Sequence, residues 1–380
     1  MFNEMSTTYV TLAIIAAFAM MPAPSLLIAQ DQAADSPAKQ QIHMTLPEIQ
    51  KGLSPYNWIR GDDYVATPIC GASLQVAFTG TRSVVLDVDT SNLKTGVASR
   101  FPVVAWSVNG GAVQTHQLSA GDKTITLCTG ETDPKIDFYV RGMSPFEDRF
   151  SGDVPVNAVK LTGFEIDAGG KVVPSQLPDK IWLNIGDSIM SGDAAAYNAG
   201  QGRPPDDAWA ASDEARASYG YLVAQHYGYR DARLAWGGYA WTGGGGGNPA
   251  LSELIDKLTS TVSRLDRDRL DPKPDVVLIN LGENGVPPAN SVTDALTKIR
   301  SRAGNKAKII LMIPLSGRGR KEIANAFSSY KESAFGDSNV FLVDLKDISY
   351  ETADGQHPTA NGHQTVYRKL VSKLDEIINN

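Results

Sequence analysis

The chain has 380 residues, of which 42% are hydrophobic and 20% are charged. This length is enough for two domains or one large one, and the composition is that of a globular protein rather than a disordered or fibrous one. Lys and Arg number 35 against 42 Asp and Glu, which gives a net charge of -7 and a pI near 5.3. Because this balance offers no basic surface for a phosphate backbone, nucleic acid is not expected as a partner.

The N-terminus carries a largely apolar run from Val10 to Met21, followed by Pro22, Pro24 and a cleavage point after Ala29. This pattern predicts a signal peptide over residues 1–29, and hence a secreted or periplasmic protein without stable membrane insertion. The start is atypical because Glu4, and no Lys or Arg, precedes the run. A short buried or interfacial segment is the alternative, since the run is too short to span a bilayer as a helix. Residues 30–42 are small, polar and aperiodic, which is typical of a linker.

Residues 43–170 consist of short β-type runs separated by Gly, Asn and Asp turns, with apolar residues alternating at a period of two. The sequence Asn109-Gly110-Gly111 predicts a hairpin between two of these runs, because both central turn positions favour residues that tolerate positive φ. Six or more antiparallel strands of this kind predict an all-β jelly-roll or sandwich domain.

The two cysteines, Cys70 and Cys128, lie in this β-rich region, outside any Cys-x-x-Cys pair or histidine cluster. A structural zinc site is therefore not expected, and no metal is predicted. Their spacing suits one disulfide in an oxidising compartment, and two separate buried thiols fit the sequence equally well.

The pattern changes after a Gly- and Pro-rich junction at residues 168–180, where apolar strands begin to alternate with helical segments. We expect strands at 181–185, 232–236, 276–281, 308–313 and 340–345. Amphipathic helical stretches are expected at 213–228, 248–265, 294–303 and 360–378. Five such βα units predict an α/β domain over residues 178–380, a parallel sheet with helices on both faces.

Functional groups of open α/β sheets gather at the carboxyl ends of the strands. The first strand runs into Gly186-Asp187-Ser188, so Ser188 is placed at a helix N-terminus and is the candidate nucleophile. The alternative is that Asp187 and Ser188 only cap the helix. If the strand order is 2-1-3-4-5, Gly238 and Asn284 arrive on either side of Ser188. With the Ser188 N–H they would form a three-donor oxyanion hole. A flexible glycine loop and an Asn-Gly turn are the alternatives.

The fifth strand leads to Asp354-Gly-Gln-His357, in a chain with five histidines. The loop is long enough to bring His357 to Ser188 as a general base. Asp354 can accept a hydrogen bond from the other ring nitrogen and fix the tautomer. The alternatives are an Asp-Gly turn and a surface or capping histidine. His363 is interpreted as structural.

These four blocks, each at the end of a predicted strand, resemble the pattern of the SGNH or GDSL hydrolase superfamily: Gly-Asp-Ser, a Gly block, Gly-x-Asn and Asp-x-x-His. The resemblance covers residues 181–380, and the β-rich region before them resembles the jelly roll of carbohydrate esterase family two. It implies a flavodoxin-like five-stranded parallel sheet. It also implies Ser188 as nucleophile, Gly238 and Asn284 as oxyanion donors, His357 as base and Asp354 as its partner.

The sequence departs from the family pattern at two positions. Ile189 replaces the leucine of Gly-Asp-Ser-Leu, which is conservative, and Gly285 replaces the aspartate that usually follows Asn284. In family-two esterases a backbone carbonyl can take the place of the carboxylate beside the histidine, so both partners remain open for His357.

The aromatic residues Tyr239, Trp241 and Trp209 lie near these blocks and are candidates for stacking against a sugar. The alternative is that they belong to the core or a lid. The loops around the blocks are small and polar, which favours a short acyl group such as acetyl. The resulting hypothesis is a secreted serine esterase without cofactor that deacetylates a carbohydrate through an acyl-serine intermediate. The alternatives are a lipid or aryl ester hydrolase and a catalytically inactive carbohydrate-binding protein.

Overall fold

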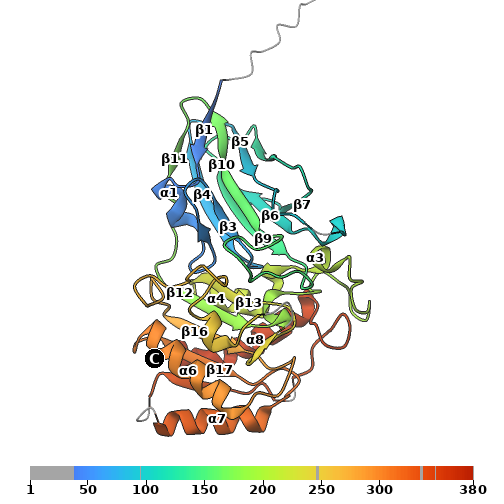
Figure 1. Cartoon of the computed structure of the whole chain (residues 1–380), viewed down its shortest axis with the longest axis vertical. Coiled ribbons are helices and arrows are strands. Elements are labelled where there is room, and N and C mark those ends of the chain that lie inside the picture. The colour runs from blue at the N-terminus through green and yellow to red at the C-terminus, as the bar shows by residue number, and fades with distance from the viewer. Residues whose placement is uncertain (1–37, 95, 245–247, 334–336, 347, 380) are drawn as a thin grey trace, which may run out of the picture. The chain divides into compact units, whose positions relative to one another are not determined.

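Two antiparallel sheets form the N-terminal part of the structure, a computed structural model that describes residues 38–379 except 95, 245–247, 334–336 and 347 (Figure 1). One sheet has the order β2-β3-β10-β5-β8, with β1 paired to β10, and the other has the order β11-β4-β9-β6-β7. Buried and half-buried residues alternate strictly in β5, as expected where one face of a sheet covers a core. The predicted jelly-roll or sandwich is confirmed. The elements are β1 (Lys39–His43), α1 (Pro47–Gly52), β2 (Ile59–Arg60), β3 (Val65–Thr67), β4 (Ser73–Thr79), β5 (Ser83–Val88), η1 (Ala98–Arg100), β6 (Val103–Val108), β7 (Gln114–Gln117), β8 (Thr124–Thr129), β9 (Lys135–Gly142), β10 (Val159–Asp167) and β11 (Lys171–Val173).

The first strand begins inside the segment expected to be a linker. Residues Lys39–His43 pair antiparallel with β10, from Lys39 opposite Asp167 to His43 opposite Gly163. The linker expected over 30–42 is therefore corrected for residues 39–42, which belong to the sheet. The signal peptide predicted over residues 1–29 lies outside the described residues.

The hairpin predicted at Asn109-Gly110 joins β6 and β7, which pair antiparallel. Asn109 has φ 53° and Gly110 has φ 73°, the positive values that this turn type requires. The cysteines follow the second of the two alternatives: Cys70 and Cys128 are separate buried thiols.

The C-terminal part is built on a parallel sheet with the order β13-β12-β16-β17-β18. In chain order this is the predicted 2-1-3-4-5 arrangement. All residues of β12 and β16 are buried, as expected for central strands covered on both faces. The elements are β12 (Ile181–Gly186), α2 (Ser188–Ser191), α3 (Trp209–Ser212), η2 (Ala215–Ala217), α4 (Tyr219–His226), β13 (Arg230–Ala235), β14 (Tyr239–Ala240), β15 (Gly243–Gly244), α5 (Leu251–Leu254), β16 (Val276–Asn280), α6 (Ala289–Ala303), β17 (Lys308–Met312), α7 (Arg320–Ser333), β18 (Val340–Val343) and α8 (Ala360–Asn379).

The helix expected over 248–265 is corrected to the single turn α5, Leu251–Leu254. After it, the Thr259 hydroxyl accepts the N–H groups of Val262 and Thr261 at 3.0 and 3.4 Å. Such local side-chain bonds compete with the helical pattern. The buried Arg264 also donates to the carbonyls of Leu254 and Lys257 and so fixes the irregular path.

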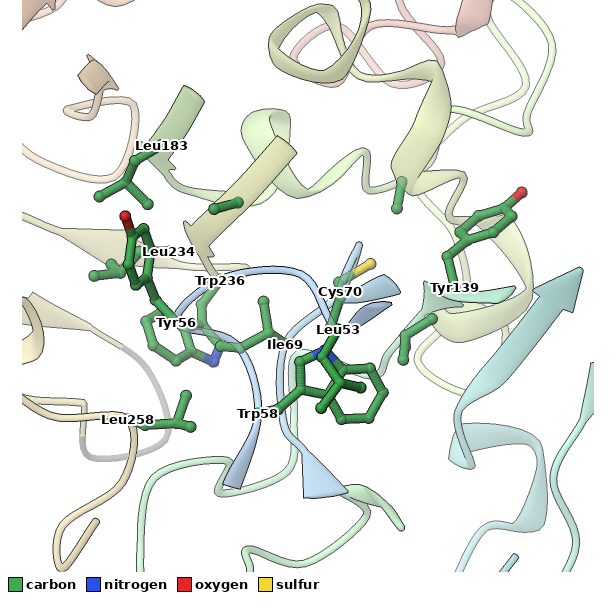
Figure 2. Close-up of a cluster of buried hydrophobic side chains, with 14 of the residues drawn as sticks. Leu53, Tyr56, Trp58, Ile69, Cys70, Tyr139, Leu183, Leu234, Trp236 and Leu258 are labelled. Atoms are coloured by element: carbon green, nitrogen blue, oxygen red, sulfur yellow. The ribbon is translucent and has the colours of Figure 1, made fainter. Parts of the chain in front are cut away.

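The two parts share one hydrophobic core. Figure 2 shows Tyr56 and Ile69 from the sandwich beside Leu234 and Trp236 from the parallel sheet, all members of one buried cluster. The described residues from Ala38 onward accordingly form a single compact unit. In the described part of the chain, no helix combines the length and apolar composition needed to cross a bilayer.

Candidate active site

Ser188 lies at the turn between β12 and α2. Asp187 is the N-cap of this short helix, and its Oδ1 accepts the N–H of Ile189 at 3.1 Å. A Cβ at Gly186 would lie 2.4 Å from the Met190 Cβ and 2.8 Å from the Asn280 carbonyl oxygen, so the tight turn requires glycine. Asp187 therefore caps the helix, as the alternative interpretation expected, but the Ser188 side chain does not and makes a different contact.

That contact is with His357, whose Nε2 lies 3.0 Å from the Ser188 Oγ. The other ring nitrogen, Nδ1, lies 2.8 Å from the Asp354 Oδ2. The Asp354 Oδ1 accepts the backbone N–H groups of His357 and Gln356 at 2.8 and 3.0 Å. Burial opposes ionisation of Asp354, but these hydrogen bonds outweigh it and lower its pKa. An ionised partner at Nδ1 favours the tautomer whose Nε2 can accept the serine proton.

Gly238 and Asn284 lie in the same pocket as Ser188, on loops after β13 and β16. Gly238 has φ 72°, in the left-handed region that favours glycine. One N–H of the Asn284 amide donates to the Tyr239 carbonyl at 2.9 Å, which fixes the orientation of the amide and leaves its second N–H available. Beside Asn284, Glu283 is buried and its carboxylate accepts the Ser316 N–H at 3.0 Å. Glu283 thus connects this block to the loop that follows β17.

Three carboxyl groups are buried around the nucleophile, on Asp187, Asp193 and Asp213. Burial, and to a smaller extent the nearby Glu283, raises the pKa of Asp187 to about 8. Burial also raises the pKa of Asp193 and Asp213. The Asp193 Oδ1 accepts the Ser191 hydroxyl at 2.5 Å. No sequence motif marks Asp193 or Asp213. Their burial results from tertiary packing against β9 and the Gly237 loop.

The pocket is a cavity of about 310 Å³ that opens over Ser188 and His357. The sandwich contributes Pro145 and Phe146, which follow β9, so both parts of the chain build the site. A Cβ at Gly237 would lie 2.7 Å from the Pro145 Cβ, so the two parts approach closely here. The lining also includes Asp193, Arg203, Trp209 and Gln356. No motif in the sequence marks Pro145, Phe146 or Arg203, and the fold alone brings them to the site.

Of the three aromatic candidates, only Trp209 lines this pocket. Its ring lies edge-on to His357 at 5.5 Å between centroids. The expectation for Tyr239 and Trp241 is corrected, because both are buried in the core. The Tyr239 hydroxyl donates to the Pro249 carbonyl at 3.2 Å, and the Trp241 Nε1 donates to the Leu281 carbonyl at 2.8 Å. Both polar groups of these rings are therefore satisfied inside the protein.

His363 is fully buried, and its Nδ1 accepts the Tyr219 N–H at 3.3 Å. Burial lowers its pKa to about 3, so it is neutral and structural at ordinary pH. Within the described ranges, no group of three His, Cys, Asp or Glu side chains is arranged to hold a metal ion.

A search among curated proteins finds no match to the sequence. Among solved structures, the fold is similar to a family two carbohydrate esterase from Cellvibrio japonicus, with a TM-score of 0.72 and 19% identity over 90% of this chain and 99% of that one. An acetyl xylan esterase from Butyrivibrio proteoclasticus matches with a TM-score of 0.69 and 16% identity over 90% and 99% of the two chains. A family two carbohydrate esterase from Clostridium thermocellum, in complex with cellohexaose, matches with a TM-score of 0.68 and 17% identity over 86% and 98%.

The model of the GDSL-like lipase/acylhydrolase family matches residues 183–370. This range contains the four blocks around Ser188, Gly238, Asn284 and His357. The parallel sheet with its preceding jelly roll is the fold of the structures just described. The α/β part of this chain therefore belongs to the GDSL-like lipase/acylhydrolase family, on the two-part architecture seen in family two carbohydrate esterases.

Proposed function

We propose that this protein is an exported serine esterase that removes O-acetyl groups from an oligo- or polysaccharide through an acyl-serine intermediate. The observation that carries the proposal is the hydrogen-bonded series from Ser188 through His357 to Asp354, with 3.0 and 2.8 Å contacts, at the floor of an open cavity. Nucleophile, base and orienting group are all within hydrogen-bond reach, which is what an activated serine requires.

In the first step, the Ser188 Oγ attacks the ester carbonyl carbon while His357 Nε2 accepts the serine proton. The Asp354 carboxylate stabilises the imidazolium that forms and holds its orientation. The tetrahedral intermediate collapses when the C–O bond to the sugar breaks and Nε2 returns the proton to the leaving sugar hydroxyl. Water, deprotonated by His357, then attacks the carbonyl carbon of the acetyl-serine. The bond from this carbon to the Ser188 Oγ breaks as Nε2 returns the proton to Oγ, and acetate leaves.

The oxyanion of each tetrahedral intermediate would receive the N–H groups of Ser188 and Gly238 and the free amide N–H of Asn284. Fixed donors of this kind stabilise the transition state more than the ground state, and losing one costs about 3 to 4 kcal/mol. The bond from Asn284 to the Tyr239 carbonyl supports this role because it holds the amide in place without using both of its hydrogens.

The size and lining of the cavity support a short acyl group. Its volume is about 310 Å³, and polar side chains such as Asp193, Arg203 and Gln356 lie among the lining residues. A long acyl chain would need an extended apolar channel to bury its methylene groups. The carbohydrate substrate rests on the similarity in fold to the family two carbohydrate esterases and to the acetyl xylan esterase.

Export rests on the apolar run from Val10 to Met21 and on Pro22, Pro24 and the cleavage point after Ala29 that follow it. Sequencing the N-terminus of the protein recovered from the medium or periplasm tests this part of the proposal. A mature chain that begins close after Ala29 is expected, and a protein that stays in the cytoplasm with residues 1–29 attached would contradict it.

Hydrolysis of the 4-nitrophenyl esters of acetate, butyrate and octanoate tests the reaction. The acetate ester is expected to have the highest kcat/KM, and Ser188→Ala and His357→Ala are each expected to lower it by about 10³-fold or more. Asp294→Asn, on the exposed face of α6, is the control and should leave the rate unchanged.

The outcomes separate the alternatives. Preference for octanoate would favour a lipid or aryl ester hydrolase. Activity that survives in Ser188→Ala would contradict the nucleophile. Absence of turnover with every ester, together with binding of a glycan, would favour the inactive carbohydrate-binding protein.

A further inference from the structure

Arg203 is an exposed cation inside the candidate active site. It lines the same cavity as Ser188 and His357. Its guanidinium carbon lies 5.6 Å from the centroid of the Trp209 ring, and the Trp209 centroid lies 5.5 Å from that of His357. A guanidinium stacked on an aromatic face keeps its in-plane N–H donors free at its edge. The Trp209 ring thus lies between Arg203 and the general base His357, and the N–H groups of Arg203 are available to a bound molecule.

No carboxylate of the described residues lies within ion-pair distance of Arg203. The neighbouring Arg100, which stacks on Phe146 at 5.1 Å, differs because it has Glu147 at 3.9 Å and also donates to the Asp206 carbonyl at 3.2 Å. Arg203, which lines the cavity, therefore differs from Arg100 in that no group in the described part of the chain accepts a hydrogen bond from its N–H groups.

The two acids that line the cavity have partners other than Arg203. Asp354 is engaged by the ring and the backbone of His357 at 2.8 Å. Asp193 is buried, bonds the Ser191 hydroxyl, and lies close enough to the buried Arg149 for their charges to interact. Burial raises the pKa of Asp193, which favours its neutral form. Arg203 is left as the cation of the cavity lining whose N–H donors have no hydrogen-bond partner in the described part of the chain.

We propose that Arg203 binds a carboxylate of the glycan, so that the preferred substrates are O-acetylated polysaccharides containing uronic acid. The planar fork of a guanidinium matches the two oxygens of a carboxylate, and such charge-assisted pairs are stronger than bonds to neutral hydroxyls. The exposed Phe146 ring, which lies edge-on to the buried Trp209 ring at 6.2 Å between centroids, provides an apolar surface for the sugar ring that carries the carboxylate. This inference rests on the proposed esterase function and specifies its substrate class.

The test compares kcat/KM for an O-acetylated oligouronide with that for an O-acetylated xylo-oligosaccharide of the same length. The wild-type protein is expected to prefer the acidic substrate by about tenfold or more. Arg203→Gln should lower kcat/KM on the acidic substrate about ten- to hundredfold more than on the neutral one, as loss of a charge-assisted pair predicts. Arg203→Lys should restore part of the preference, since it keeps the charge but not the fork.

Inhibition by unacetylated oligosaccharides tests binding by Arg203 without any dependence on the position of the acetyl group, and a second arginine variant serves as the control. Unacetylated oligouronide is expected to inhibit hydrolysis of 4-nitrophenyl acetate more strongly than xylo-oligosaccharide does, and this difference should shrink at 1 M salt, where the Debye length falls to about 3 Å. Arg368 is an exposed arginine on α8, so Arg368→Gln removes one positive charge away from the cavity. This variant should change neither the preference for the acidic substrate nor the stronger inhibition by oligouronide.

Equal kcat/KM for both glycans, or an equal fall on both in Arg203→Gln, would overturn the role of Arg203 while leaving the esterase intact. Failure of the esterase itself has a different signature, because the wild type would then not hydrolyse 4-nitrophenyl acetate. Thermal unfolding of each variant confirms that the protein is folded when its preference is measured.

Discussion

Asp354 and His357 could be paired from the sequence because they are close along the chain. The turn Asp-Gly-Gln-His lets one carboxylate accept the backbone N–H groups of Gln356 and His357 and also face Nδ1 of the ring. Local spacing determines this geometry. Pro145, Phe146 and Arg203 could not be predicted in the same way, because they reach the pocket only after two distant parts of the chain have packed together.

Replacing Asp354 by Asn tests the orienting role of the carboxylate. The amide cannot stabilise the imidazolium and favours the wrong tautomer, so kcat for 4-nitrophenyl acetate should fall by about 10²- to 10⁴-fold. The exposed Asp294→Asn serves as the control for the loss of one negative charge. A fall of less than tenfold would mean that a backbone carbonyl is sufficient to orient His357.

Asp187 makes stability depend on pH. Burial raises its pKa in the folded protein to about 8, from an ordinary value of 3.8, so the folded protein retains a proton that the unfolded chain releases. Its contribution is fully present below about pH 4 and is lost as pH rises towards 8. The wild type should therefore lose stability relative to Asp187→Asn between pH 5 and pH 8, measured by urea unfolding. A difference that stays constant over this range would contradict a protonated Asp187.

The sequence predicted the strands of the parallel sheet, but the helix that it predicted over 248–265 does not form. Except for β13, which contains Arg230, Asp231 and Arg233, the parallel strands are largely apolar runs. The edges of all five agree with the expected ranges within about two residues. The segment 248–265 has helical composition but bonds its own backbone through Thr259 and Arg264. These local bonds, together with the bond from Arg264 to the Tyr56 carbonyl, override the helical propensity of the segment.

Strand β13 is an edge strand that the sandwich region covers through Asn57. The Asn57 Nδ2 donates to the Arg233 carbonyl at 2.5 Å, and its Oδ1 accepts the Arg233 N–H at 3.2 Å. Asn57→Ala leaves both buried backbone groups unpaired, at about 1 to 3 kcal/mol for each. Its free energy of unfolding should fall well below that of Asn339→Ala, whose bond to the Asn305 carbonyl is exposed. Equal free energies of unfolding for the two variants would show that the hydrogen bonds from Asn57 to β13 do not stabilise the protein.

Composition and hydrophobic periodicity predicted two parts of the molecule, but they did not predict that the two parts share one hydrophobic core. One buried cluster includes Ile69 and Trp58 from the sandwich with Leu183 and Trp236 from the parallel sheet. Arg216 adds a charged link, since its two terminal nitrogens donate to the Asp137 carboxylate at 2.7 and 2.6 Å. Which side chains cross between two parts cannot be determined from patterns within either.

This shared core predicts that both parts unfold together. Calorimetry of the intact chain should give one transition, and Arg216→Gln should lower its midpoint without splitting it. Two separated transitions, with only one sensitive to Arg216→Gln, would mean that the sandwich and the α/β part are independently stable.

Acylation of Ser188 can be observed as the intact mass of the protein after rapid acid quenching of its reaction with 4-nitrophenyl acetate, followed by peptide mapping. We expect a mass increase of one acetyl group on the peptide containing Ser188, absent from Ser188→Ala. An acetyl group on another residue of the active enzyme, with the Ser188 peptide unmodified, would contradict this role of Ser188.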